Sequence, residues 1–218
     1  MKPAVAFILA LPCCVPPCYA DEPALSWSVL REGENLPLSK VTQDARPPFK
    51  IDRDVPFRIE FGRGSGWEGL DVIKVAQDGR VIVYRMKSER HEGDLLQKPG
   101  VLVYEERAAL TIPPKAVGEI LKAVDDNGLL GLHKEYQADE NVEDGTQWVL
   151  WIRQDKSEKC IYFNNHFPEA ILRFAKAIDV VLDAHGLAKV AWHRVPDENG
   201  RNHEDALWAA VDRYLGDD

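Results

Sequence analysis

The chain has 218 residues, 36 acidic and 27 basic side chains, and a formal net charge of −9 at pH 7. An acidic balance spread along the chain opposes nonspecific binding to nucleic acid or to anionic membranes. A hydrophobic fraction of 45% and six tryptophans exclude a disordered chain. We therefore expect a folded protein that does not bind nucleic acid.

The first twenty residues have the layout of a secretory signal peptide. Lys2 supplies a positive start, residues 4–11 form an apolar run, and small residues stand three and one positions before a cut that follows Ala20. The run is too short and too rich in proline to cross a bilayer as a helix, and no later segment comes close. We expect cleavage after Ala20 to leave a soluble mature chain with no membrane span and a net charge of −10, in the periplasm or secreted.

Three of the four cysteines, Cys13, Cys14 and Cys18, lie inside this leader. A zinc site would need a second pair downstream, and a lipidated cysteine would need small residues directly before it, so both alternatives fit less well than removal. The mature chain then retains Cys160 alone and forms no internal disulfide. Because Cys160 lies in a strand-like run, it indicates a small buried residue rather than a catalytic thiol.

The domain organisation follows from a change in pattern near residue 56. Residues 21–55 predict an irregular lead-in with one strand, in "ALSWSVLRE", and residues 56–218 predict a single domain. "PFRIEF" alternates apolar and charged residues with the period of a half-buried strand. Asp78-Gly79 between two β-branched runs predicts a hairpin, and "GVLVYEERAALTI" predicts a further strand.

Helices are expected after each group of strands. Thr111, with two prolines close behind it, predicts a capped helix start, and Asn127-Gly128 predicts the end of that helix. "TQWVLWIRQDKSEKCIYFNN" then contains two strands around a polar turn, followed by a helix from about Pro168 to residues 185–186. A C-terminal helix over 202–216 has a narrow apolar stripe, which predicts docking onto the domain.

These elements predict an α+β fold: an antiparallel sheet of about six strands with two main helices on one face, plus the C-terminal helix. The similarity of "ILKAVD" to "FAKAID" hints at a duplicated strand-strand-helix unit. Trp148, Leu150 and Ile152 alternate with Val149 and Trp151, so this strand is apolar on both faces. We expect it to be central and covered on both sides, or else to display Trp151 to a ligand.

Residues 57–185 resemble a family of exported bacterial α+β domains whose function is unassigned. The matching segments are "GSGWEG", "VAQDGRVIVY", "ILKAVDDNGLLGL" and "AKAIDVVL". The resemblance implies a hairpin with a "DG" turn, a helix, a second hairpin and a second helix. Family members often carry two cysteines in the opening segment, and this chain has none at 62–69, so a role for that pair does not transfer.

Two places are candidate ligand sites. "FNNHFPE" sets Asn164, Asn165 and His166 between aromatic residues at a strand-to-helix junction, where turn formation and capping also explain the asparagines. The outer surface of the sheet near Trp67 and Trp151 is the second place.

Other motifs argue against a cofactor. The glycines of "GRGSGWEG" precede a strand rather than a helix N-terminus, so they indicate a turn or bulge instead of a phosphate loop. His91, His133 and Asp144 lie in polar loops that the sequence does not bring together, so a metal site built from them is an alternative only. We expect no cofactor and no metal.

The first functional hypothesis is a noncatalytic exported domain that binds a protein, a peptide or a glycan. The alternatives are a metal-dependent hydrolase that uses His91, His133 and Asp144, and a structural module of an envelope assembly. Convergence of three ligand side chains would favour the hydrolase.

Overall fold

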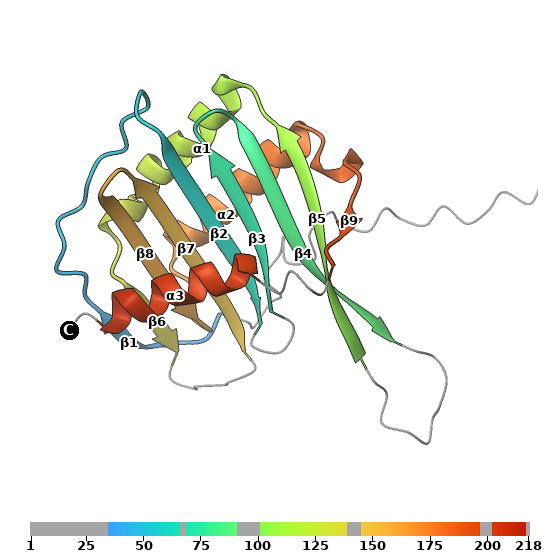
Figure 1. Ribbon diagram of the computed structural model, residues 1–218. Helices are drawn as coiled ribbons and strands as arrows, with labels where there is room; N and C mark the ends of the chain where they lie inside the picture. Colours follow the sequence, from blue (N-terminus) through green and yellow to red (C-terminus); the bar gives the residue numbers. More distant parts are fainter. Residues whose placement is uncertain (1–34, 66–68, 91–100, 139–144, 197–201, 217–218) are drawn as a thin grey trace, which may run out of the picture.

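The computed structural model describes residues 35–65, 69–90, 101–138, 145–196 and 202–216. Within these ranges, nine strands form one mixed sheet in the order β1-β6-β8-β7-β2-β3-β4-β5-β9 (Figure 1). The strands are β1 (Leu38–Thr42), β2 (Phe57–Ser65), β3 (Gly69–Ala76), β4 (Arg80–Arg90), β5 (Val101–Thr111), β6 (Glu135–Ala138), β7 (Thr146–Gln154), β8 (Ser157–Asn164) and β9 (His193–Arg194). The helices are α1 (Pro114–Asp126), α2 (Glu169–Ala184) and α3 (Asn202–Gly216), with 3₁₀ turns η1 (Leu129–Gly131) and η2 (Leu187–Lys189).

The sheet confirms the α+β class and corrects its details. The six strands that the sequence predicts within the described residues are β8-β7-β2-β3-β4-β5, which pair with one another in antiparallel fashion. The prediction missed β1, β6 and β9, and β6 pairs with β8 in parallel. These three strands have five, four and two residues, which is too short for a clear alternation of polar and apolar residues. The predicted strand in "ALSWSVLRE" lies outside the described residues.

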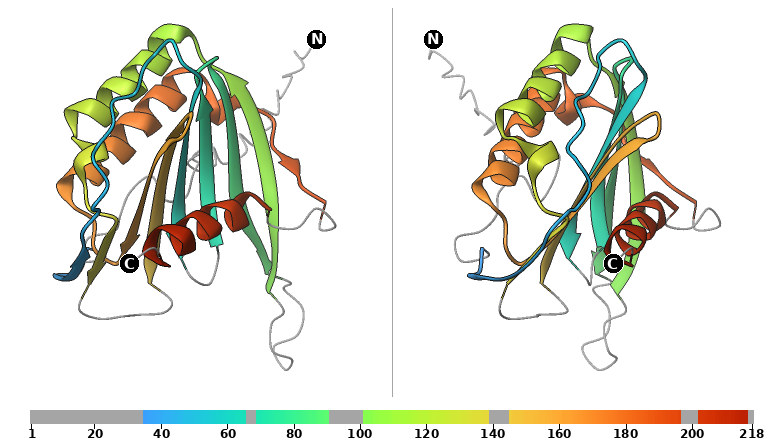
Figure 2. Two further views of the ribbon diagram at one scale, coloured as in Figure 1. Left: turned by 60° about the vertical axis from the view of Figure 1, so that its left-hand side comes forward. Right: turned by 90° about the vertical axis from the view of Figure 1, so that its left-hand side faces the viewer.

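The helices lie on both faces of the sheet (Figure 2). α1 and α2 pack against each other and against one face, which we call the inner face. The core between them contains the alternate residues Ile59, Phe61, Ile73 and Val75 of β2 and β3. α3 lies on the opposite, outer face, so the three helices are divided between the two faces of the sheet.

The two inner-face helices end alike. Gly128 and Gly186 follow α1 and α2 with φ of 61° and 90°, a left-handed conformation that glycine adopts without strain. Each leads into a 3₁₀ turn whose first residue, Leu129 or Leu187, is buried in the core. The expected Thr111 cap is wrong, because Thr111 is the last residue of β5 and the α1 N-cap is Pro113, without a side-chain hydrogen bond.

The lead-in is more ordered than its composition indicates. Residues 38–42 form β1 at the sheet edge, and Asp44 pairs with Lys159 of β8 at 2.8 Å between Oδ2 and Nζ, with both side chains buried. The Gln154 side chain accepts from the Asp52 N–H at 2.8 Å and donates to the Asp52 and Val55 carbonyls. These long-range bonds anchor the segment to the sheet.

A buried ion pair joins α2 to the inner face. Arg63 of β2 is 1% exposed, and its guanidinium donates to both carboxylate oxygens of Asp179 at 2.8 and 2.6 Å. Two parallel charge-assisted bonds fix both the position and the orientation of the pair. Asp179 is the acidic residue of "AKAIDVVL", so the segment that carried the family resemblance has a structural function here.

Next to this pair, Asp71 lies where β4 diverges from β3. The β3–β4 ladder stops at Val72 and Tyr84, and beyond it the Met86 N–H donates to Asp71 Oδ1 at 2.6 Å. Burial raises the pKa of Asp71 to about 8, against the opposing effects of the Met86 N–H and of Arg63 nearby.

Across the described residues, every helix is too short or too polar to span a lipid bilayer.

Candidate functional site

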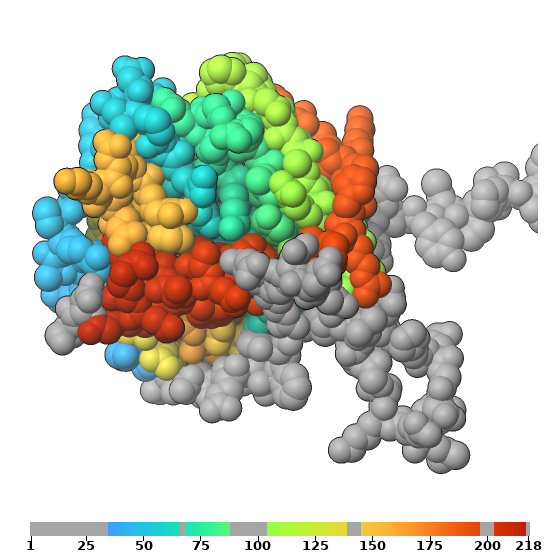
Figure 3. Space-filling model, viewed as in Figure 1, coloured from blue at the N-terminus to red at the C-terminus, as the bar shows by residue number. Residues whose placement is uncertain are grey.

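The outer face of the sheet is divided into a covered part and an open part. α3 crosses β8, β7, β2 and β3 and buries Leu207, Ala210, Val211 and Tyr214 against apolar residues of those strands. In Figure 3, α3 lies across the lower half of the sheet, and the upper parts of the strands are open above it. The open part is therefore the part of the sheet surface that a ligand can reach.

Two glycines of β2 explain why α3 lies where it does. A Cβ at Gly62 would lie 2.9 Å from Leu207 Cδ1, so the missing side chain leaves room for the helix. A Cβ at Gly64 would lie 2.0 Å from the carbonyl oxygen of Gly69, so this position accepts no side chain without movement of the backbone. Both residues are part of a regular strand, which corrects the expectation of a turn or bulge for Gly62 and Gly64.

α3 is held at both ends by polar contacts. At its start, His203 Nδ1 lies 2.7 Å from Glu105 Oε2, and Glu204 accepts a hydrogen bond from the Leu70 N–H. At its end, the Tyr214 hydroxyl donates to the Glu158 carbonyl, and Arg213 pairs with the Glu158 carboxylate at 3.1 Å. Burial of Leu207 alone contributes about 2 kcal/mol.

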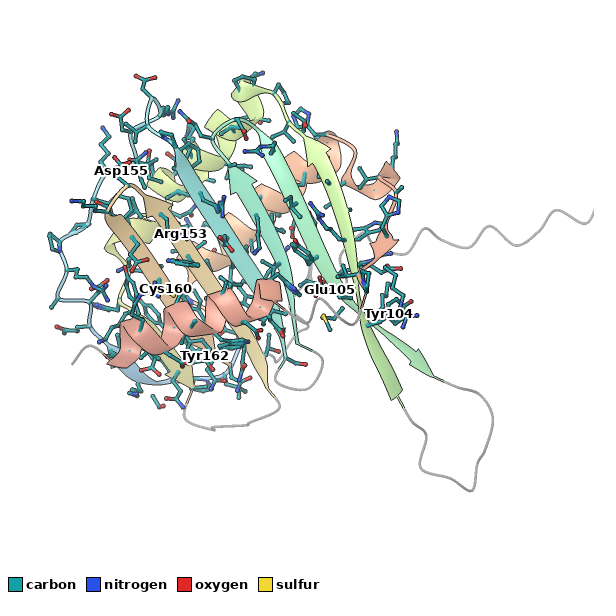
Figure 4. The ribbon with its side chains drawn as sticks, in the orientation of Figure 1. Tyr104, Glu105, Arg153, Asp155, Cys160 and Tyr162 are labelled. Atoms are coloured by element: carbon teal, nitrogen blue, oxygen red, sulfur yellow. The ribbon has the colours of Figure 1, made fainter. Side chains whose placement is uncertain are left out.

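Besides Arg80, which is paired with Asp78 at the β3–β4 turn, four cationic side chains lie on the open part of the outer face, and we call them the cationic face: Arg58, Lys74, Arg107 and Arg153. Strand register brings them together from β2, β3, β5 and β7. Arg58 lies opposite Arg153, Glu60 lies opposite Lys74, and Arg107 lies opposite Tyr84 of β4. Figure 4 shows Arg153 on the sheet above α3.

A single buried carboxylate lies among these cations. Glu60 is 2% exposed, and its oxygens lie 2.5 Å from Arg153 Nη2, 3.1 Å from Lys74 Nζ and 3.9 Å from Arg58 Nη1. The three cations are 34%, 20% and 56% exposed, so each keeps part of its surface in contact with solvent. Glu60 neutralises one of the three charges around it, so this cluster has an excess of positive charge in a protein of net charge −9.

Aromatic rings support the cations from below and beside. The Arg153 guanidinium lies 3.7 Å above the Trp151 ring, and Trp151 Nε1 donates to Glu158 at 3.1 Å. The Tyr84 ring stacks on His203, with 4.4 Å between the ring centroids, and Lys74 Nζ lies 5.5 Å from its centre. Cation–π contact of this kind restrains the orientation of a long side chain. The donors of this surface are therefore partly preorganised.

The chemistry of this surface is anion recognition. Arginine presents several N–H donors in a planar fork that fits a carboxylate, sulfate or phosphate group, and lysine presents a compact charge. Partial exposure allows an anion to replace water at these donors while Glu60 stays bound below. Burial raises the pKa of Tyr84, so its phenol remains a neutral donor beside Arg107.

Trp67 and Trp151 were the predicted site residues on the outer face. Trp67 lies outside the described residues. Trp151 is 6% exposed, and its strand is central between β8 and β2, which agrees with the expectation that the strand is covered on both sides. Trp151 therefore does not display its ring but supports Arg153, whose guanidinium covers it.

Asn164, Asn165 and His166 form a junction between chain segments. Asn165 has a φ of 56°, and its Oδ1 accepts from the Thr146 N–H at 2.8 Å while its Nδ2 donates to Asn164 Oδ1 at 2.9 Å. His166 Nδ1 lies 2.8 Å from the carbonyl oxygen of Leu36. These bonds join the lead-in, β7 and β8, so turn formation accounts for the asparagines, and a ligand at these residues stays a prediction.

The described residues do not form the alternative metal site. His133 is half-buried beside Tyr136, while His91 and Asp144 lie outside the described residues. Within the ranges described, no group of three His, Cys, Asp or Glu side chains is placed to hold a metal ion. Cys160 is buried beneath α3, and burial raises the pKa of its thiol to about 12.

Sequence reasoning missed Arg58, Lys74, Arg107 and Arg153. The signal was present locally, because Arg58 and Glu60 alternate with the buried residues of "PFRIEF" and so must share the opposite face of β2. Which strands lie beside β2 was not evident from the sequence. Comparison with protein families, with curated proteins and with solved structures finds no match to this chain.

Proposed function

We propose that the protein is a noncatalytic binding domain that acts outside the cytoplasm and recognises an anionic partner through the cationic face. The location rests on the leader sequence, with its apolar run and its small residues before position 21. The partner is a protein, peptide or glycan that carries carboxylate, sulfate or phosphate groups.

One observation carries the proposal. Three cationic side chains from three adjacent strands converge on the buried carboxylate of Glu60, at a part of the sheet that α3 leaves open. If each cation were matched by one carboxylate, the cluster would be neutral and stabilisation of the fold would account for it. Here the cations outnumber the acid, their exposed sides point to solvent, and Arg107 adds a fourth positive charge beside Tyr84.

The choice of residues also fits binding rather than stability. Exposed ion pairs contribute only about 0–1 kcal/mol each, so Arg58, at 56% exposure and 3.9 Å from Glu60, adds little to the fold. A positive surface on an acidic protein attracts an anion locally while the overall charge opposes indiscriminate binding of polyanions. Selective recognition of an anionic partner follows from this combination.

The test compares two double variants with the same change in charge. Arg58→Gln/Arg107→Gln removes two exposed cations of the cationic face, and Lys122→Gln/Arg173→Gln removes two exposed cations from α1 and α2 on the inner side. Each protein is applied to a panel of immobilised anionic and neutral peptides and glycans.

We expect anionic probes to bind the parent chain and the control variant, and to bind the Arg58→Gln/Arg107→Gln variant roughly tenfold more weakly. Binding that is equal in all three proteins, or that is confined to neutral probes, would contradict the proposal. The location is tested by determining the N-terminal residue of protein recovered from its native cells, for which we expect Asp21.

A further inference from the structure

We infer that the anionic partner is a linear acidic polysaccharide that lies across the strands of the sheet, in contact with the cationic face. This inference rests on the proposed function and narrows it from anionic ligands in general to one class. Three features of the surface support it: the kind of hydrogen-bonding groups it offers, the pairing of its backbone, and the spacing of its charges.

The cationic face offers hydrogen-bond donors and few acceptors. Arginine and lysine side chains only donate. Among the described side chains that flank the four cations, the outward-facing residues besides Glu60 are Trp151, Ala76, Ile82, Tyr84 and Ala109. Glu60 is buried and its oxygens face Arg153, Lys74 and Arg58. The nearest other carboxylate, Glu158 opposite Arg153, already accepts from Trp151 and Arg213. A ligand therefore has to supply acceptors.

A peptide is a poor match for such a surface. Peptide ligands of sheets usually gain affinity by adding a strand, which requires unpaired backbone groups. β2 is paired with β7 over Phe57–Ser65 and with β3 over Arg58–Ser65, so it has no free edge at this surface. The backbone N–H groups of a bound peptide would stay in water or face the donors of arginine, and neither arrangement adds affinity.

An acidic polysaccharide matches the same surface. Its carboxylate or sulfate groups accept from arginine in pairs, and its ring and hydroxyl oxygens accept further bonds. Ala76 and Ile82 make the sheet surface beside the cations apolar and free of long side chains. Such a surface can pack against the C–H faces of sugar rings. The Tyr84 phenol adds a neutral donor at the margin of this area.

The charges are spaced for a chain of moderate charge density. Arg153 lies on β7 and Arg107 on β5, with β2, β3 and β4 between them. Four steps of ~4.8 Å between neighbouring strands and four residues of ~3.3 Å along them place the outermost cations ~23 Å apart, on a line oblique to the strands. Four cations over this distance suit about one anionic group per sugar. Duplex DNA has one charge per ~1.7 Å, so most of its phosphates would face no cation and would be repelled by the net charge of −9.

The experiment measures binding in solution by calorimetry. The probes are a short oligogalacturonate, a neutral oligosaccharide of equal length, an oligoglutamate of equal charge and a single-stranded oligonucleotide of equal charge. The proteins are the parent chain, the Arg58→Gln/Arg107→Gln variant and the Lys122→Gln/Arg173→Gln control. Circular dichroism of all three shows that the variants are folded.

We expect the oligogalacturonate to bind the parent and the control at least tenfold more tightly than the other probes, and the Arg58→Gln/Arg107→Gln variant to lose roughly tenfold in affinity for it. The affinity of the parent chain for the oligogalacturonate should also fall roughly tenfold between 50 and 200 mM salt. If the oligoglutamate or the oligonucleotide binds as tightly as the oligogalacturonate, with the same dependence on Arg58 and Arg107, the assignment to a polysaccharide is wrong and the proposed binding of anions by the cationic face stands. If no anionic probe depends on these arginines, both proposals are wrong.

Discussion

The carboxyl group of Asp71 should make the stability of this protein fall steeply with rising pH. Asp71 is 3% exposed and its Oδ1 accepts the Met86 N–H, while its Oδ2 has no hydrogen-bond partner among the described residues. Its pKa is about 8 in the folded chain, against an ordinary value of 3.8. The folded state therefore keeps the proton over a pH range in which the unfolded state has lost it.

The sign follows from proton linkage. Between pH 3.8 and about 8 the folded state binds one more proton at Asp71 than the unfolded state, so the free energy of unfolding decreases as the pH rises. The stability associated with the protonated form is fully present below pH 3.8 and is lost as the pH passes through 8. Each pH unit changes the free energy of unfolding by ~1.4 kcal/mol. Between pH ~5 and ~8 the loss is therefore on the order of 4 kcal/mol.

Asp71→Asn removes this titration and keeps an oxygen that can accept the Met86 N–H. We expect the variant to gain ~4 kcal/mol in the free energy of unfolding relative to the parent between pH ~5 and ~9. Urea titrations at both pH values measure the difference, and comparison with the parent cancels the other titrating groups. Asp126→Asn, at an exposed position of α1, is the control and should change little with pH. A relative gain below ~1 kcal/mol would show that Asp71 is ionised in the folded protein at neutral pH.

Two further changes test the packing of the outer face. Gly64→Ala should lower the free energy of unfolding by about 3 kcal/mol, because its Cβ would lie 2.0 Å from the Gly69 carbonyl oxygen. The control Gly131→Ala, with no atom within 4 Å of the new methyl group, should change it by less than ~0.5 kcal/mol. Equal losses of the two variants in chemical denaturation would refute the close approach. The buried Cys160 thiol, with its pKa raised to about 12, should resist iodoacetamide in the folded protein and react after denaturation. Mass spectrometry of the Cys160 peptide follows the reaction, and rapid alkylation of the native chain would mean that α3 does not stay in place.

The sequence determined the elements whose signals are local. The alternation in "PFRIEF", the turn at Asp78-Gly79 and the glycines at 128 and 186 each depend on a few neighbouring residues, and the structure has β2, the β3–β4 hairpin and both helix ends where they indicate. The apolar stripe of residues 202–216 likewise predicted a helix that docks. Such signals reflect backbone geometry and side-chain periodicity, which act over one turn or one strand.

The tertiary structure decided what depends on contacts between distant segments. The short strands β1, β6 and β9 exist because longer neighbours pair with them, so their own sequences carry little evidence. The cationic face needs the order β7-β2-β3-β4-β5, which brings Arg153 beside Arg58 and Lys74 although about 80 to 95 residues separate them in the chain. Alternation along a strand predicts which residues share a face, but the strands beside it are chosen by the packing of the whole core. For that reason the sequence predicted an outer sheet surface, and only the fold identified the charges on it.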